Sequence, residues 1–313
     1  MSKFVAFFGE CMLELQGQAF GPLQQSQGGD TYNSAVYLAR CGAARGLRVA
    51  YASALGTDAL SQAMLARWAD EGLETQLVRQ IPGKLPGLYW IELDARGERQ
   101  FHFWRNASAA RQYFDVDPSP VEAAATQLDA FYCSGIGLAI LEPAARERLL
   151  GLMERLRARG TTVVFDNNFR PSLWPDTASA RPWYVRAFAA ASLALITLED
   201  HQALLGGVDE AAALADARAL GVPECVVKRG ARSTLIHQAG TPDWLEVPVT
   251  PVAQVVDTTA AGDAFAAGYL SRRLHGTDAP SSAAFGNALA GRVIQHRGAV
   301  IPRATMQDLV DAV

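Results

Sequence analysis

The segment Asp257-Thr258-Thr259-Ala260-Ala261-Gly262-Asp263 places small residues between two carboxylates. The apolar run that follows predicts a helix, which puts Ala260, Ala261 and Gly262 at its N-terminus. Backbone N–H groups there lack intrahelical partners, and the helix dipole favours an anion beside them. Asp263 would lie in the first turn, where its carboxylate can take the proton of a hydroxyl group held against that anion. The segment therefore predicts a phosphate-binding helix start that contains a base.

The sequence also bears on a simpler role for this segment and on two other classes of nucleotide-binding protein. An Asp near a helix start is usually a cap, so Gly262-Asp263 alone would indicate only that. The chain contains no Gly-x-x-x-x-Gly-Lys-Ser/Thr string, which excludes a P-loop. Gly9-Glu10-Cys11 and Gly135-Ile136-Gly137 are too sparse for a dinucleotide-binding fingerprint, which argues against an NAD-dependent dehydrogenase.

The composition of the chain limits the classes of partner that it can bind and indicates the cellular compartment. The 313 residues carry a formal net charge of -4, so there is no broad cationic surface for nucleic acid. The longest apolar stretches, such as residues 193–198, are far shorter than the roughly 20 residues that span a bilayer, so no membrane segment is expected. The 4 cysteines are widely separated, without the spacing of a zinc site or a disulfide framework. They indicate reduced thiols and a cytoplasmic protein.

The elements that must position the helix start indicate a doubly wound α/β fold. Apolar runs predict strands, and Ala- and Leu-rich segments between most of them predict helices. Strands without a polar face suit a mainly parallel sheet that is covered by helices on both sides. Ligands bind such sheets beyond the carboxyl ends of the strands. The predicted strands are residues 4–9, 49–55, 130–134, 162–166, 193–197 and 225–228.

One region departs from this alternation. Residues 87–93 and 99–104 flank a predicted turn at 94–98, which is a β-hairpin pattern. With residues 11–15 as a further strand, the hairpin would form a small β-sheet lid. We therefore expect a single domain over residues 1–313, with lid segments at about 11–33 and 86–105 inserted in the α/β core. The chain from Ala260 onward is expected to be mostly helical.

Two motifs resemble the signatures of the ribokinase-like carbohydrate kinase family. Residues 257–263 resemble its Asp-Thr-Thr-Gly-Ala-Gly-Asp string, with Ala260 in place of the first Gly. Residues 28–35, Gly28-Gly29-Asp30-Thr31-Tyr32-Asn33-Ser34-Ala35, resemble its N-terminal sugar-binding signature. The resemblance spans essentially the whole chain. It implies an ATP-dependent phosphotransferase in which Asp263 is the base, residues 260–262 form the anion hole, and Gly28, Gly29, Asp30 and Asn33 bind the sugar.

The same resemblance implies a nucleotide site. Residues 225–233 resemble the strand and turn beneath the nucleotide, which places Lys228, Gly230 and Arg232 there. Residues 195–200 fall where relatives often carry an Asn-x-x-Glu element that influences magnesium and phosphate, but that element is not intact here. Glu199 or Asp200 would then contact Mg²⁺, and Glu199 would do so through water. Asn168, Thr197 and Asn287 complete the residues that the resemblance assigns to ATP.

The acceptor is expected to be a sugar acid. Tyr89 and the string at 101–110 resemble the 2-keto-3-deoxygluconate kinases of this family. Arg105 or Arg170 could bind the carboxylate of such a substrate through two parallel hydrogen bonds. The plainer interpretation is that both arginines form surface salt bridges. His102 and Trp104 are candidate substrate contacts as well, although aromatic residues on a hairpin more often pack into a core.

We therefore expect phosphorylation of 2-keto-3-deoxygluconate at its terminal hydroxyl group, which would give the 6-phosphate. A kinase for a neutral sugar such as fructose or ribose, or for a nucleoside, would use the same core. A sugar-binding sensor without catalysis is an alternative from another class. Exposed hairpin edges and aromatic faces in the lid further predict a homo-oligomer that associates through it.

Overall fold

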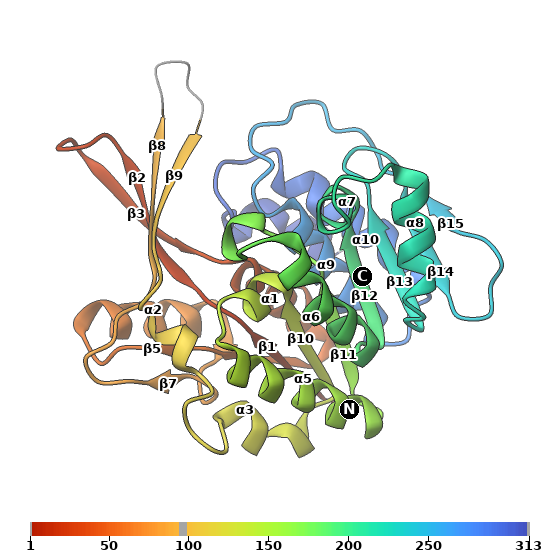
Figure 1. Ribbon diagram of the computed structural model, residues 1–313. Helices are drawn as coiled ribbons and strands as arrows, with labels where there is room; N and C mark the ends of the chain where they lie inside the picture. Colours follow the sequence, from red (N-terminus) through yellow and green to blue (C-terminus); the bar gives the residue numbers. More distant parts are fainter. Residues whose placement is uncertain (1, 94–98, 312–313) are drawn as a thin grey trace.

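A nine-stranded sheet forms the centre of the molecule in the computed structural model, which describes residues 2–93 and 99–311 (Figure 1). Seven neighbouring strands run parallel, and the last two pair antiparallel at one edge. In spatial order the strands are β15 (Leu245–Val247), β14 (Thr234–Gln238), β13 (Glu224–Lys228), β12 (Leu193–Thr197), β11 (Thr162–Asp166), β10 (Ala130–Ser134), β1 (Lys3–Phe8), β4 (Leu47–Ala52) and β6 (Leu73–Glu74).

Helices cover both faces of this sheet, which confirms the doubly wound α/β prediction. Strand β1 shows why, since Phe4, Ala6 and Phe8 point into one core and Val5 and Phe7 into the other. One face is covered by α3 (Pro120–Ala123), α4 (Gly135–Ala139), α5 (Pro143–Ala158), α6 (Thr177–Ala190), α7 (Leu198–Leu204) and α8 (Glu210–Ala219). The other is covered by α1 (Asp30–Gly42), α2 (Ala59–Asp70), α9 (Ala261–Arg273), α10 (Ala279–Val293) and α11 (Gln307–Asp311). Within the described residues, no helix has the length and apolar character to cross a membrane.

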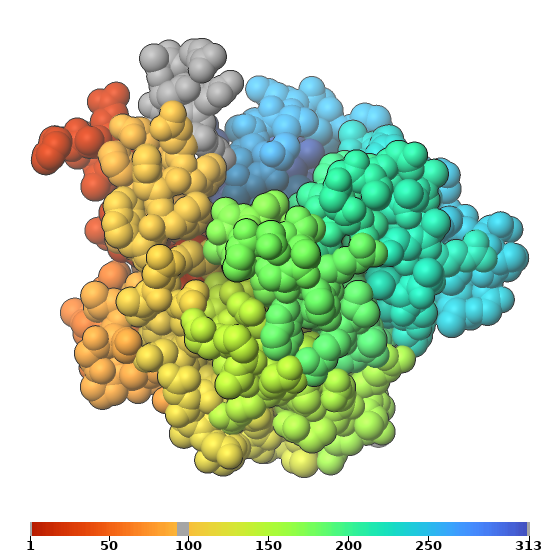
Figure 2. Space-filling view, in the orientation of Figure 1, coloured from red at the N-terminus to blue at the C-terminus, as the bar shows by residue number. Residues whose placement is uncertain are grey.

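A second sheet of four strands projects from one end of the larger sheet, as Figures 1 and 2 show. Its order is β3-β2-β8-β9, with β2 and β8 parallel and both outer pairs antiparallel. The strands are β2 (Met12–Gly17), β3 (Leu23–Gly28), β8 (Leu88–Leu93) and β9 (Arg99–Trp104). We call this sheet the lid. The predicted hairpin turn at 94–98 lies outside the described residues.

The sequence pattern did not predict several of the strands, and each omission has a physical reason. Strand β3 has the sequence LQQSQG, whose polar character hides it from a search for apolar runs. Strands β14 and β15 form an antiparallel extension that alternating strands and helices do not predict. The predicted strand at 49–55 is divided into β4 and β5 (Ala54–Leu55), and β5 pairs with β7 (Arg79–Gln80) in a separate two-stranded sheet.

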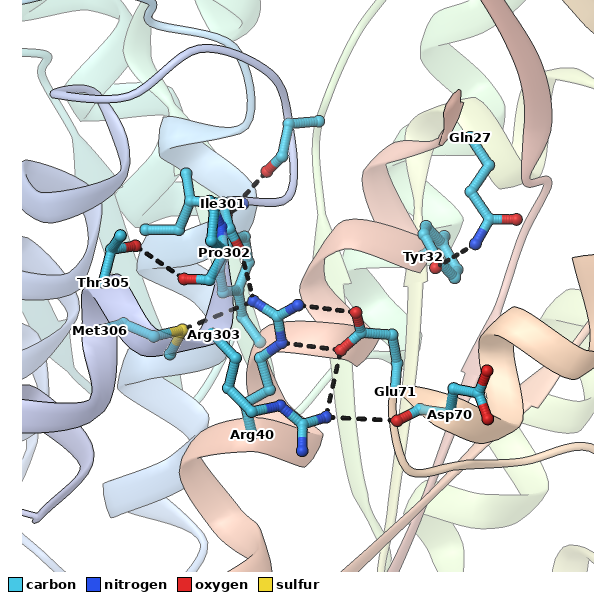
Figure 3. Close-up of polar contacts among 12 residues, drawn as sticks. Gln27, Tyr32, Arg40, Asp70, Glu71, Ile301, Pro302, Arg303, Thr305 and Met306 are labelled. Atoms are coloured by element: carbon cyan, nitrogen blue, oxygen red, sulfur yellow. Dashed lines mark hydrogen bonds and ion pairs between the residues drawn. The ribbon is translucent and has the colours of Figure 1, made fainter. Parts of the chain in front are cut away.

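Helix α1 carries Asp30 and Asn33 at its start, and a buried arginine anchors its other end (Figure 3). The Arg40 guanidinium donates to both carboxylate oxygens of Glu71, at 2.7 and 2.8 Å, and to the Ile301 carbonyl at 2.6 Å. Although burial alone would raise the pKa of Glu71, the bonds from Arg40 hold it below its usual value. Arg303 also donates to Glu71, at 3.3 Å. The helix that presents the predicted sugar-binding residues is thus tied to the C-terminal segment.

Replacing Arg40 by Met is expected to reduce the free energy of unfolding by about 3 kcal/mol, because it leaves a partly buried carboxylate without its main partner. The matched control is Arg48→Met. Arg48 forms a similar two-bond pair with Glu74, but its side chain is 54% exposed, against 5% for Arg40. That loss should stay within about 1 kcal/mol. Urea unfolding of both variants measures the difference, and equal losses would show that the Arg40 contacts do not anchor the helix.

Candidate active site

The start of α9 is shaped by an alanine in the left-handed region. Ala260, the N-cap residue, has φ 61° and ψ 14°. This conformation turns the chain from the preceding loop into the first turn of α9. The Ala261 N–H donates to the Thr258 carbonyl at 3.3 Å, whereas among the described residues no acceptor binds the Gly262 N–H. Of the residues predicted for the anion hole, Gly262 thus supplies an N–H group that has no protein partner in the described part of the chain.

The conformation of Ala260 is one that suits glycine, which is the residue that the resembled signature has at this position. A Cβ atom in the left-handed region costs about 1–2 kcal/mol, while glycine costs about 0.5–1 kcal/mol in chain entropy. Ala260→Gly is therefore expected to raise the free energy of unfolding by about 0.5–1 kcal/mol, the difference between these two effects. Ala215→Gly, at an exposed site inside α8, should instead lower it by about 1 kcal/mol. If chemical denaturation shows equal losses in both, Ala260 carries no strain.

A pocket of about 650 Å³ opens at the start of α9, beyond the carboxyl ends of β11, β12 and β13. The predicted site residues that line it are Asp30, Asn33, Asn168, Arg170, Thr197, Glu199, Lys228, Gly230, Ala260, Ala261, Gly262, Asp263 and Asn287. The structure thus brings residues from six separate segments to one place. Its charged side chains are Asp30, Asp166, Glu199, Asp200 and Asp263 against Arg170, Lys228 and Arg229. The carboxylates outnumber the cations, so a polyphosphate would need a bound cation to bind here.

Asp263 has the electrostatics of a base. Its carboxylate accepts a hydrogen bond from Asn33 Nδ2 at 2.8 Å. Burial and the nearby Asp30 carboxylate raise the pKa of Asp263 to about 8, partly offset by the Asn33 hydrogen bond and the Lys228 charge. A carboxylate with this pKa accepts protons more readily than an exposed one near neutral pH. Asn33 and Asp263 therefore form one unit that can receive a hydroxyl group.

The carboxyl end of β11 contributes residues that the sequence prediction missed. Asp166 is buried and accepts a hydrogen bond from Lys228 Nζ at 2.8 Å. The Asn167 amide joins the end of β11 to β12 through two bonds: its Oδ1 accepts from the Thr197 N–H, and its Nδ2 donates to the Thr197 carbonyl. Its Oδ1 also accepts from the N–H group of Asn168. The expectation that ligands bind beyond strand ends could have found Asp166. No pattern in the sequence announces the bridging role of Asn167.

Asn168 lines the pocket and also contacts Asp30, one of the predicted sugar-binding residues. Its Nδ2 donates to Asp30 Oδ2 at 2.7 Å, and its φ of 23° lies in a region that asparagine tolerates better than most residues. Asn287 lines the pocket, but its Oδ1 accepts from Thr234 at 2.9 Å, so it also packs α10 against β14. Arg232 lies outside the lining and forms an exposed ion pair with Glu210 at 2.5 Å. The geometry therefore gives no support to the predicted contact between Arg232 and the nucleotide, which stays a prediction.

The two predicted carboxylate-binding arginines differ sharply. Arg105 is buried and paired with Glu10, away from the pocket lining. Arg170 lines the pocket, with its side chain 47% exposed. Nη1 makes all the hydrogen bonds of Arg170 within the described residues, to the Phe169 carbonyl at 2.8 Å and to both Asp200 oxygens at 3.0 Å. Its Nη2 and Nε remain available for a second carboxylate.

The predicted lid residues do not form one surface. Register pairs Tyr89 with Phe103 and Trp90 with His102, so Tyr89 projects from one face of the lid, and His102 and Trp104 project from the other. Tyr89 donates to Glu14 Oε2 and lies against Gly28, where a Cβ atom would come within 2.8 Å of its hydroxyl oxygen. The His102 ring contacts the Trp90 ring at a tilt, and Trp104 is 59% exposed.

The glycines of the sugar-binding signature serve protein contacts. A Cβ atom on Gly29 would lie 2.1 Å from the Glu10 carbonyl oxygen, so this glycine lets the connection between β1 and β2 approach the start of α1 closely. Gly28 makes room for the Tyr89 hydroxyl group in the same way. Neither glycine lines the pocket. The close approach that the sequence assigned to a sugar is made here by the protein itself.

The described residues contain no group of three or more His, Cys, Asp or Glu side chains that could hold a metal ion. Glu199 and Asp200 do line the pocket, at the start of α7. Burial raises the pKa of Asp200, although Arg170 offsets part of this effect. Two carboxylates without a cage fit Mg²⁺, which commonly keeps waters and binds one or two carboxylates together with substrate phosphates.

Comparison with known proteins agrees with this geometry. The sequence matches the pfkB family carbohydrate kinase model over residues 2–306. It is 45% identical over 308 residues to the 2-dehydro-3-deoxygluconokinase of Dickeya dadantii (strain 3937), covering 97% of this chain and 99% of that protein. The crystal structure of a PfkB protein from Polaromonas sp. JS666 is 28% identical and superposes with a TM-score of 0.81 over 100% of both chains. The crystal structure of fructokinase with bound ATP from Xylella fastidiosa is 24% identical and superposes with a TM-score of 0.83. The superposition covers 100% of this chain and 99% of the fructokinase chain, and this likeness supports the fold alone.

Proposed function

The chain belongs to the pfkB family of carbohydrate kinases, and on this basis we propose that it transfers the γ-phosphoryl group of ATP to the terminal hydroxyl group of 2-keto-3-deoxygluconate. The enzyme is a phosphotransferase with an alcohol group as acceptor. The observation that carries the proposal is the position of Asp263 in the first turn of α9, in one pocket with Asn33, Arg170 and Lys228. The 45% identity to a 2-dehydro-3-deoxygluconokinase supports the choice of acceptor.

In the proposed reaction, Asp263 takes the proton of the terminal hydroxyl group as that oxygen attacks the γ-phosphorus and the bond to ADP breaks. The Gly262 N–H and the helix dipole stabilise charge on the phosphoryl oxygens, with Ala260 and Ala261 shaping the turn. Mg²⁺ bound together with ATP would supply positive charge to the phosphates. Glu199 and Asp200 are the residues that would hold its waters. Gly230, Thr197, Asn168 and Asn287 would border the nucleotide.

The carboxylate of the sugar acid is assigned to Arg170. Its Nη2 and Nε face no protein acceptor among the described residues, whereas Arg105 is committed to Glu10 in a buried pair. A guanidinium fork with two free donors matches a carboxylate. Asp30 and Asn33 would bind sugar hydroxyl groups, and Tyr89, which packs against Gly28, would border the sugar from the lid. A neutral sugar would leave the Arg170 donors unpaired, which is the basis for acceptor choice.

Product analysis tests the reaction. Incubation with ATP, Mg²⁺ and 2-keto-3-deoxygluconate should yield ADP and a phosphate ester on the terminal carbon, which ³¹P–¹H correlation spectroscopy identifies. A kinase for fructose, ribose or a nucleoside would instead give the ester with a neutral acceptor. Absence of transfer to every acceptor would revive the alternative of a non-catalytic sugar-binding sensor.

We further propose a homo-oligomer that associates through the lid. Phe101 and Phe103 lie close together on the Tyr89 face and are 49% and 53% exposed, and Trp104 is 59% exposed on the other. Exposed aromatic groups of this kind mark association surfaces.

All four cysteines are buried free thiols, which supports a cytoplasmic location. One kinase domain over residues 1–313 with an inserted lid is the organisation we propose.

A further inference from the structure

An ion pair spans the ends of two strands next to the proposed anion hole. Asp166 ends β11 and Lys228 ends β13, with β12 between them. Register pairs Asp166 with Leu195 and Leu195 with Val226. Because side chains alternate along a strand, Asp166 and Lys228 project from the same face, the one that α9 covers. The Lys228 side chain crosses over the end of β12 to place Nζ 2.8 Å from Asp166 Oδ2.

The pair does not resemble a purely structural salt bridge. A buried ion pair stabilises a fold only when its remaining polar atoms are satisfied. Tyr132 donates to Asp166 Oδ2 at 3.1 Å, but Oδ1 is buried and has no partner within the described residues. Asp166 and Lys228 both line the pocket. Within the described residues, one oxygen of the Asp166 carboxylate thus holds the ammonium group while the other has no protein partner.

The position of Lys228 suits the transfer step. A Cβ atom on Gly262 would lie 3.4 Å from Lys228 Nζ, so the ammonium group is beside the first turn of α9. Asp166 is its only hydrogen-bond partner within the described residues, and an ammonium group has three donors. Phosphoryl transfer spreads negative charge over the equatorial oxygens. A lysine has many conformations, so its contribution depends on a partner that fixes it.

We propose that Asp166 is a positioning residue for phosphoryl transfer, which holds the Lys228 ammonium group beside the N-terminus of α9 so that it faces the transferred phosphoryl group. This inference rests on the proposed function and adds a role for a residue outside both family signatures. Without Asp166, Lys228 would be drawn toward the other carboxylates of the pocket, among them the base itself. Asp166 thus keeps the cation and the base apart.

The same geometry couples both residues to Asp263. Asn33 from α1 donates a hydrogen bond to its carboxylate, and the charges of Asp30 from α1, Asp166 from β11 and Lys228 from β13 act on it. The Asp263 charge in turn acts on Arg170, Tyr37, Tyr89 and Tyr132. The Asp166 charge raises the pKa of Asp263 and the Lys228 charge lowers it. The base acts in its deprotonated form, so activity should rise with pH through this pKa. Removing Asp166 should move that limb to lower pH, and removing Lys228 should move it to higher pH.

The test compares Asp166→Asn, Lys228→Met and the double variant by steady-state kinetics across pH. Each single change should lower kcat by about 10²-fold, with the KM for the acceptor within about twofold because neither residue binds it directly. The double variant should be no slower than Lys228→Met, since Asp166 acts through Lys228. The rising limb, near pH 8 in the parent enzyme, should shift in opposite directions in the two single variants.

The proposal would be overturned if Asp166→Asn changed neither kcat nor the pH at which activity rises. It would also be overturned if the loss of kcat in the double variant equalled the product of the losses in the two single variants. If Asp166→Asn does not fold, Lys228→Met and the double variant still decide, because the double variant contains no unpaired buried charge. Equal kcat values then support the proposal, and a further loss in the double variant contradicts it. The measurements use whichever acceptor is phosphorylated best, since Lys228 faces the phosphoryl donor. A wrong acceptor would therefore be distinguished from a wrong role for Asp166.

Discussion

Asp263→Asn is expected to lower kcat by about 10³-fold, because an amide cannot accept the proton of the attacking hydroxyl group. Asn occupies the same space, so the fold and the pocket should persist. The dissociation constants for ATP and the sugar acid, measured by calorimetry, should stay within about threefold, since the base contributes mainly in the transition state. The large loss arises from the position of Asp263 at the start of α9, 2.8 Å from Asn33 Nδ2.

Asp308→Asn provides the control for this prediction. Asp308 forms a surface pair with Arg292 at 2.7 Å, and its side chain is 65% exposed. Its replacement should leave kcat unchanged. A variant at Asp263 that keeps near-normal turnover would remove Asp263 from the role of base.

Arg170→Met is expected to lower kcat/KM for 2-keto-3-deoxygluconate by about 10²-fold, because a charge-assisted pair with the acceptor carboxylate is worth about 1.5–3 kcal/mol. The value of kcat/KM for a neutral sugar should be unchanged or higher in this variant, since that acceptor has no carboxylate to pair with Arg170. Arg170→Lys should fall between them, because lysine keeps the charge but not the fork. Kinetics with both acceptors measure the difference.

Arg232→Met is the matched control for the Arg170 variant. Arg232 has a similar exposure, at 53%, and also pairs with a single carboxylate, but it lies outside the pocket lining. Its replacement should leave kcat/KM unchanged for both the sugar acid and the neutral sugar. A loss with Arg170→Met that is equal for charged and neutral acceptors would show that Arg170 supports the pocket and does not select a carboxylate.

The sequence predicted the central sheet because its parallel strands are buried on both faces. Runs such as β1 and β12 are almost entirely apolar and could be recognised without further information. The polar strand β3 could not, since its residues gain their structure from pairing with β2. The family and the fold class were confirmed by the family match and by the structural neighbours.

The candidate site was accessible to sequence reasoning where chemistry depends on local order. The start of α9 is local, so residues 260–263 could be named from their spacing. Asp166 and Lys228 meet through a contact across β12, 62 residues apart in sequence, which only the folded sheet reveals. Which lid residues share a surface depends on the register of the strands, and the register places His102 on the face of the lid opposite to that of Tyr89. The roles of the individual site residues remain predictions for the variants described above.

The central claim is the identity of the acceptor, and comparison of kcat/KM for a panel of acceptors with ATP tests it most directly. The panel contains 2-keto-3-deoxygluconate, gluconate, fructose, ribose and a nucleoside at matched concentrations. We expect 2-keto-3-deoxygluconate to exceed every neutral acceptor by at least about 10²-fold, the factor that a charge-assisted carboxylate contact supplies. A higher kcat/KM for fructose, ribose or the nucleoside would contradict the assignment.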